Sequence, residues 1–274
     1  MGNKDSRSRH GICKLTGASG KLVKSHIIPR ALTPPKIGGA AFSQIGNGQQ
    51  PVRRFDSWYD PNLVTQHGED ILTDYDTYAI SELRRLQLIW HSWGPMQVLS
   101  TSDFDPLARL RVIRFRDPAK MRLFFLSLLW RAAATQLSEF REIELNRKDM
   151  KLLRRIVRDG WMPDDSFYPI SLVQLSNLGV KHNLTPLAQT KFIPPVSDAP
   201  ARSQPIFRFY FDGLIAHVHR DCDDTTLEGI EPFMVGNQQT LVMTIPTEQS
   251  WQRQNLDNLV FEADRDFPSK RIGA

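Results

Sequence analysis

The residue of this sequence best placed to do chemistry is His26, which stands in the short run Leu22–Arg30, LVKSHIIPR. The β-branched and apolar residues around it favour a strand, and Pro29 predicts where that strand ends. A strand would hold the imidazole at a fixed angle, and an imidazole exchanges protons near neutral pH. We therefore expect His26 to be a fixed chemical group.

A helix is expected later in the chain. From Glu69 to about Trp90 apolar residues recur every three or four positions, which predicts an amphipathic helix. Glu69 and Asp70 fall in its first turn, where the helix dipole favours negative charge. Asp76 lies further along the same segment.

Two segments carry a resemblance: Cys13–Arg30, CKLTGASGKLVKSHIIPR, and Asn62–Asp76, NLVTQHGEDILTDYD. Together they resemble the HNH (ββα-metal) endonuclease family, by motif over residues 13–90 and more loosely over Phe124–Arg131. The resemblance implies that His26 is the general base that activates water. It also implies that Glu69 binds a metal, Mg²⁺ or Mn²⁺, with Asp70 and Asp76 as supporting carboxylates.

The chain departs from the family pattern at the zinc knuckle. Family members carry two Cys-x-x-Cys pairs where this chain has CKLT, Cys13–Thr16, and TQHG, Thr65–Gly68. Three of the four zinc ligands are therefore missing, so we expect no structural zinc and a unit held together by packing. Ser25 also replaces the acidic residue that often precedes the histidine, and a hydroxyl is a weaker Mg²⁺ ligand than a carboxylate.

Basic residues suggest a nucleic-acid partner. The formal net charge of +5 permits binding to a phosphate backbone. Arg53 and Arg54 alternate with aromatic residues, which suits phosphate contact and base stacking, although a cation–π pair closing a loop fits equally well. With Lys24 and Arg30 beside the histidine, they form the expected nucleic-acid-binding set, with DNA favoured over RNA. The basic segment Arg147–Arg158 predicts an amphipathic helix whose charges either face solvent or follow phosphates.

The remaining segments predict a buried helix and a small sheet. Ala119–Leu137 is apolar nearly all round, and its Arg131 is expected to pair with a buried carboxylate or to cap loop carbonyls. Ile206–His219 predicts a hairpin around Asp212-Gly213, and Thr240–Pro246 predicts a third strand. His217 and His219 share one face of their strand, where metal binding is possible in principle but ordinary sheet positions are favoured.

The sequence thus predicts an α+β fold in three parts. Residues 1–95 form an HNH-like ββα unit with a mobile N-terminal arm, residues 96–192 a helical region, and residues 193–274 a linker and a small antiparallel sheet. No apolar run approaches about 18 residues and the N-terminus lacks the apolar core of a signal peptide, so we expect no membrane contact and a cytoplasmic protein. Cys13 and Cys222 are expected to be free thiols.

Three functions follow from these patterns. The favoured one is a divalent-metal-dependent endonuclease, in phage defence or a mobile element. The second is a catalytically inactive nucleic-acid-binding module of the same fold, whose DNA binding would survive EDTA. The third is a protein-interaction subunit of a larger complex, whose basic surface is incidental and which would keep a stable protein partner.

Overall fold

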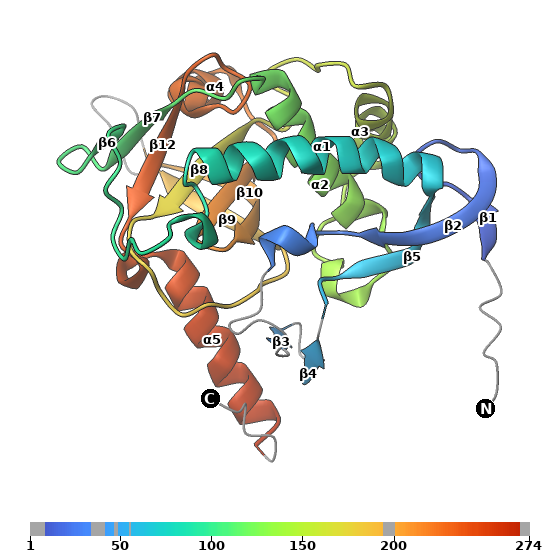
Figure 1. The fold of residues 1–274 in the computed structure, drawn as a ribbon, viewed down its shortest axis with the longest axis horizontal. Coiled ribbons are helices and arrows are strands. Elements are labelled where there is room, and N and C mark those ends of the chain that lie inside the picture. The colour runs from blue at the N-terminus through green and yellow to red at the C-terminus, as the bar shows by residue number, and fades with distance from the viewer. Residues whose placement is uncertain (1–8, 34–41, 47–48, 55, 194–200, 269–274) are drawn as a thin grey trace.

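The structure is a computed structural model, which describes residues 9–33, 42–46, 49–54, 56–193 and 201–268. Its described part is a mixed α+β fold (Figure 1). The helices are α1 (Gln66–Arg85), α2 (Pro118–Ala134), α3 (Arg147–Asp159), α4 (Asp224–Ile230) and α5 (Trp251–Asp266). The strands are β1 (His10–Ile12), β2 (Ser19–His26), β3 (Phe42–Gly46), β4 (Gln49–Arg54), β5 (Tyr59–Thr65), β6 (Phe104–Asp105), β7 (Leu110–Ile113), β8 (Ile170–Leu175), β9 (Leu187–Ile193), β10 (Arg202–Phe211), β11 (Leu214–His219) and β12 (Thr240–Ile245).

The first sheet is antiparallel, with the strand order β1-β2-β5. β2 carries His26, as the sequence predicts, but it ends at His26 itself, three residues before Pro29, and His26 pairs with Tyr59 at the start of β5. α1 begins immediately after β5, so two strands and a helix follow one another around the histidine. β3 and β4, which lie between β2 and β5 in the chain, form a separate two-stranded ribbon.

Three helices pack side by side near this sheet, each against the next one in the chain. α1 contacts α2, and α2 contacts α3 (Figure 1). The expected buried helix is confirmed as α2, which begins at the N-cap Asp117 and has Pro118 in its first turn. The expected basic helix is α3, and it ends at Gly160, whose φ of 70° is the left-handed geometry that glycine adopts without strain. Tyr75 of α1 ties the two outer helices together by donating to the carbonyl of Val157 at 3.0 Å.

The second sheet has seven strands in the order β6-β7-β12-β8-β11-β10-β9. β12 runs parallel to β8, and the other neighbouring strands are antiparallel. The prediction of a small antiparallel C-terminal sheet is therefore wrong. β6, β7, β8 and β9 come from the region expected to be helical, and β12 pairs with two of them rather than with the hairpin. Short apolar runs such as Arg111–Phe115 do not reveal their partners, because those partners are far away in sequence.

The predicted hairpin around Asp212-Gly213 is confirmed. β10 and β11 pair from Ile206↔His219 to Phe211↔Leu214, and both turn residues have positive φ, 46° and 92°. This backbone matches the twist of the flanking strands, and Asp-Gly is a preferred sequence for it. A Cβ on Gly213 would also lie 2.4 Å from the indole nitrogen of Trp90, so only glycine fits there.

Successive side chains of β10 point to opposite sides of the large sheet, so its two faces pack against different apolar clusters. Phe207, Phe209 and Phe211 face the main core, which also contains the side chains of α2. Tyr210 belongs to a smaller apolar cluster on the opposite face, together with Ile215 of β11. α5 starts just after β12 and extends away from the sheet (Figure 1).

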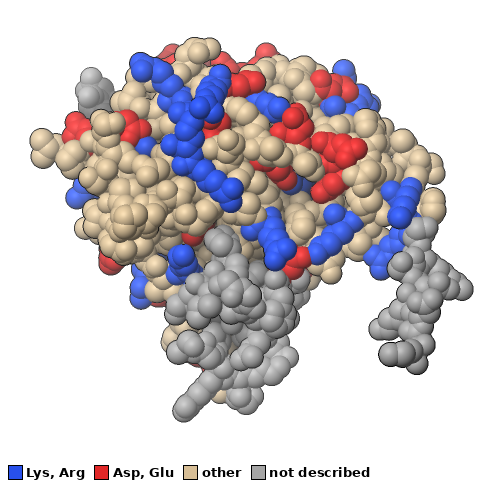
Figure 2. Space-filling view, in the orientation of Figure 1, with Lys and Arg blue, Asp and Glu red and all other residues tan. Residues whose placement is uncertain are grey.

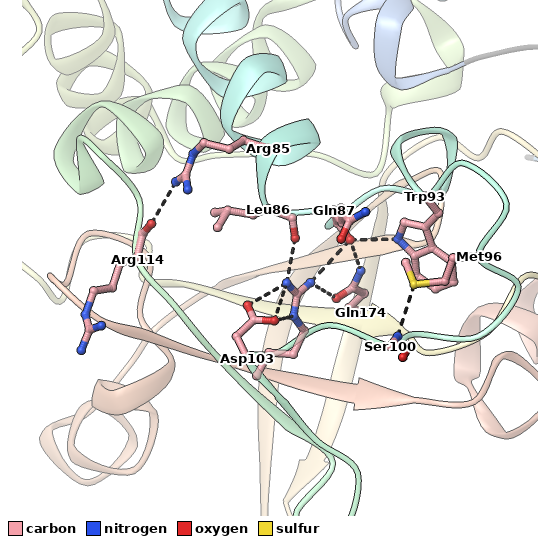
Figure 3. A network of polar contacts seen from close by, with 10 residues as sticks. Arg85, Leu86, Gln87, Trp93, Met96, Ser100, Asp103, Arg114 and Gln174 are labelled. Carbon is pink, nitrogen blue, oxygen red and sulfur yellow. Dashed lines mark hydrogen bonds and ion pairs between the residues drawn. The ribbon is translucent and has the colours of Figure 1, made fainter.

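A buried arginine joins the large sheet to the end of α1. Arg111 of β7 donates to both carboxylate oxygens of Asp103, at 2.8 and 3.0 Å, and to the side chain of Gln174 at 2.7 Å (Figure 3). It also donates to the carbonyl oxygen of Leu86, directly after α1, at 2.7 Å. The guanidinium charge is thus paired, which a charge removed from water requires.

None of the described helices is long and apolar enough to cross a bilayer. The face of the molecule seen in Figure 2 carries both basic and acidic side chains. The net positive charge therefore does not make this face uniformly basic.

Candidate active site

His26 stands at the end of β2 with its imidazole partly exposed; 26% of the side chain is accessible. Its Nε2 lies 3.3 Å from Oδ1 of Asp56, which is on the segment leading into β5. The ring also meets the edge of the Tyr59 ring, with the two ring centres 6.2 Å apart. The imidazole is therefore oriented on one side and accessible on another.

Asp56 is the centre of a small charged cluster. Lys24 of β2 forms an ion pair with it, and Nε of Arg30 lies 3.7 Å from Oδ1. Burial acts to raise the pKa of Asp56, but hydrogen bonds from Lys24 and His26 outweigh it and lower the pKa below its usual value. Asp56 is thus a carboxylate at neutral pH and accepts a hydrogen bond from Nε2 of His26. The two predicted nucleic-acid-binding residues Lys24 and Arg30 are brought together with His26 through this carboxylate.

Glu69 lies in the first turn of α1, close enough to His26 for their charges to interact. Burial raises its pKa, and the Ser25 hydroxyl and the charge of Arg131 only partly oppose that rise. Oε2 of Glu69 and Oγ of Ser25 are both buried, and neither atom makes a hydrogen bond of ordinary geometry with a described residue, although the hydroxyl lies near enough to stabilise the carboxylate. A buried carboxylate oxygen without a well-aligned donor is a group that a cation or a water molecule would stabilise.

The other two predicted carboxylates differ in their surroundings. Asp76 interacts with Glu69 but is held by Arg131 of α2, whose Nη1 donates to Oδ2 at 3.0 Å. The expected pairing of Arg131 with a carboxylate is thus confirmed. Asp70 is not part of this group; it is exposed, and Gln66 donates to its Oδ1 at 2.7 Å. Glu69 and Asp70 have different surroundings because consecutive residues of an α-helix project about 100° apart.

The four positions that correspond to the zinc knuckle also come together. Cys13 is fully buried, its Sγ accepts from the amide of Thr16 at 3.4 Å, and it interacts with the side chain of Thr65. A Cβ on Gly68 would lie 2.8 Å from that same Sγ. The knuckle positions are therefore filled by close packing around one thiol.

A basic groove lies along α3. Its cavity has a volume of about 700 Å³ and no acidic side chain among the described residues that line it. Those residues are Lys14, Leu145, Arg147, Met150, Lys151, Arg154, Arg155 and Arg158. The predicted arginines Arg53 and Arg54 lie on β4, and their side chains are outside the described part of the structure.

Sequence reasoning missed Asp56 as a site residue. Its only signal was an acidic residue among the basic and aromatic residues before Pro61. Its partnership with His26 depends on how β2 and β5 pair across the intervening 32 residues, and that register is not readable from local pattern. His217 and His219 are buried in the sheet, and Nε2 of His219 lies 2.8 Å from the hydroxyl of Ser171.

Within the described ranges, no group of three or more His, Cys, Asp or Glu side chains is arranged to hold a metal ion. Comparisons with known proteins identify no relative: no protein-family model, curated protein or solved structure matches the chain. Any functional conclusion therefore depends on the geometry of the chain itself.

Proposed function

We propose that this protein is a divalent-metal-dependent endonuclease of the HNH type, which hydrolyses phosphodiester bonds of nucleic acid with His26 as the general base. The observation that carries the proposal is the hydrogen bond between His26 and Asp56 at the end of β2, beside the buried carboxylate of Glu69. A histidine held by a carboxylate and still open to solvent is suited to accepting a proton from water.

The tautomer follows from the charge of Asp56. Because its lowered pKa keeps Asp56 ionised, Nε2 of His26 carries the hydrogen and donates it. Nδ1 then has the free lone pair, and no described residue hydrogen-bonds to it. In this proposal Nδ1 takes the proton from the attacking water.

Glu69 fits the role of a single carboxylate ligand. Mg²⁺ is commonly bound through one or two carboxylates, with water and substrate phosphate oxygens completing the coordination. Glu69 offers a buried oxygen without a hydrogen bond of ordinary geometry to a described residue, whereas Asp76 is engaged by Arg131 and Asp70 lies apart. A cation at Glu69 would polarise the scissile phosphate and stabilise the leaving oxygen. Asp76 would then serve by holding Arg131 and the end of β2 in place.

The basic groove along α3 supports a nucleic-acid substrate. Its cations project from one face of a helix and from Lys14, near the start of the N-terminal sheet. Rows of such cations bind phosphate backbones by releasing condensed counterions, which makes the affinity strongly salt-dependent. DNA remains favoured over RNA as the substrate in this proposal.

The second candidate is a nucleic-acid-binding module without catalysis. The engagement of Asp76 by Arg131 favours it, because that ion pair leaves Glu69, among the described residues, as the one predicted metal ligand that has a buried carboxylate oxygen without a hydrogen bond of ordinary geometry. Such a module would bind DNA through the groove of α3 whether or not a metal is present.

Cleavage of plasmid and single-stranded DNA by the purified protein, with Mg²⁺ or Mn²⁺ and with EDTA, tests the proposal. His26→Ala and Glu69→Ala should each lower the metal-dependent rate by about 10²–10⁴-fold. His67→Ala removes a neighbouring exposed histidine and is the matched control that should cut normally. Cutting that persists in His26→Ala would overturn the proposal. Binding without cutting at any metal, unchanged by EDTA and by His26→Ala, would establish the second candidate instead.

A further inference from the structure

A second cavity opens on the seven-stranded sheet, on the face opposite the one that packs against the main core. The residues that line it are far from His26 in the sequence. Its volume is about 300 Å³, within the range of small-molecule sites. The five strands β8 to β12 and the start of α5 supply its walls, through Val173, Ile215, His217, Met243, Ile245 and Trp251, among others. Most of these side chains are apolar.

The charged side chains among the described residues of this cavity are all cationic. Arg208 of β10, Lys191 of β9 and Arg109 line it, and no aspartate or glutamate among the described residues does. Arg208 is only 4% exposed, and its Nε and Nη1 have no hydrogen-bond partner among the described residues. His217 pairs with Arg208 across the strands, and its Nδ1 likewise has no partner in the described part of the chain.

Burial of these cations without a counter-charge is energetically unfavourable. Burial lowers the pKa of Arg208 to about 10 and lowers that of Lys191, and no described carboxylate offsets either. Burial, followed by the charges of Lys191 and Arg208, keeps the pKa of His217 well below its usual value. Buried arginines elsewhere in the chain are paired, as Arg111 is with Asp103 and Arg131 with Asp76. Since buried charges are normally paired, Arg208 calls for a partner of opposite charge.

The beginning of α5 adds to the positive electrostatic potential of the cavity. Gln249, Ser250 and Trp251 line the cavity, and α5 starts at Trp251. The N-terminus of a helix carries partial positive charge, which attracts anions. Figure 1 shows α5 beginning beside the end of β12, which contributes Met243, Thr244 and Ile245 to the same cavity.

We propose that this cavity binds a small organic anion, whose carboxylate or phosphate group pairs with Arg208 and Lys191 and whose apolar body contacts Ile215, Met243 and Trp251. Nε and Nη1 of Arg208 make no hydrogen bond with a described residue, and a guanidinium group binds carboxylate and phosphate alike. The neutral imidazole of His217 can donate a further hydrogen bond. This site is independent of the proposed nuclease site, because the two share no residue.

Titration calorimetry on the full chain tests the proposal with four probes: benzoate, phenyl phosphate, inorganic phosphate and the neutral benzamide. We expect at least one of the two aromatic anions to bind at least tenfold more tightly than benzamide and more tightly than inorganic phosphate. Comparison of benzoate with phenyl phosphate shows which acid group the site prefers. If neither anion binds more tightly than benzamide, the proposal is wrong.

Arg208→Met keeps the length of the side chain and removes its charge. It should weaken binding of the preferred anion at least tenfold, and without ligand it should unfold at a temperature no lower than the wild type. Arg265→Met, at the exposed far end of α5, makes the same charge change and should bind as the wild type does. If Arg208→Met does not fold, Lys191→Met takes its place in the binding comparison. Binding that is equal in the wild type and in the folded variant would overturn the proposal.

Discussion

Arg131 of α2 holds Asp76 of α1 through both guanidinium amino groups, and its Nη1 also donates to the backbone carbonyl of His26 at 3.1 Å. One side chain therefore fixes the end of β2, which carries the candidate base, against the two helices beside it. Arg131 itself is 1% exposed, and the hydroxyl of Ser127 supplies a further partner at 2.9 Å. The geometry of the candidate site depends on this contact.

Arg131→Met should strongly destabilise the fold. It leaves the carboxylate of Asp76 without its partner, and removing one member of a buried pair costs about 3–5 kcal/mol. Urea unfolding followed by circular dichroism measures the loss. The control is Lys120→Met, which breaks the more exposed pair with Asp74 between the same two helices and should cost less than about 1 kcal/mol. Equal losses in the two variants would contradict the role given to Arg131.

Asp56→Asn should impair the candidate base while leaving the fold intact. The amide of the introduced asparagine cannot provide the negative charge that holds Nε2–H of His26, and loss of such an orienting group typically lowers activity about 10–100-fold. The measurement is the rate of metal-dependent DNA cleavage at a fixed pH. Asp74→Asn, a similar charge loss at an exposed position of α1, should cut at the wild-type rate. A full rate in Asp56→Asn would show that the carboxylate does not orient His26.

Glu69→Gln should stabilise the apo protein in a pH-dependent way. Burial raises the pKa of folded Glu69 above its usual value of 4.5, so the favourable protonated form is lost as the pH rises through the raised value. Glutamine is uncharged throughout. Melting temperatures of the two proteins in EDTA should therefore agree below pH 4.5 and separate by about 2–4 °C at pH 8, with the variant higher. A variant that melts lower than the wild type at pH 8 would contradict the buried state of this carboxylate.

Asp103→Asn should change stability with the opposite pH dependence to Glu69→Gln. Burial alone would raise the pKa of Asp103, but hydrogen bonds from Arg111 and Thr101 outweigh it and lower the pKa below 3.8. The stability that the carboxylate contributes is thus complete above about pH 3.8 and is lost as the pH falls through the lowered value. The variant should be about 1–3 kcal/mol less stable at pH 7 and close to the wild type near pH 2. Asp264→Asn, at an exposed position of α5, should be neutral at both pH values; a deficit in Asp103→Asn that does not shrink in acid would contradict the ion pair with Arg111.

Local pattern was sufficient for several elements of the fold. The strand that carries His26, the buried helix α2, the basic helix α3 and the hairpin at Asp212-Gly213 all follow from periodicity, caps and turn residues. Each of these signals lies within a few residues of the element that it predicts, so the sequence carries them directly. The prediction that Arg131 pairs with a carboxylate also came from the sequence, since a lone charge in an apolar helix requires a partner.

The tertiary structure decided which distant residues meet. The sequence by itself placed His26 on a strand and Glu69 in the first turn of a helix, yet it did not show that Asp56 holds the imidazole or that Asp76 is engaged by Arg131. It also carried no sign that Lys191, Arg208 and His217 line one cavity, because they come from three different strands. Strand pairing between remote segments sets such encounters, and the free energy that selects the pairing is distributed over the whole core rather than encoded in any one motif.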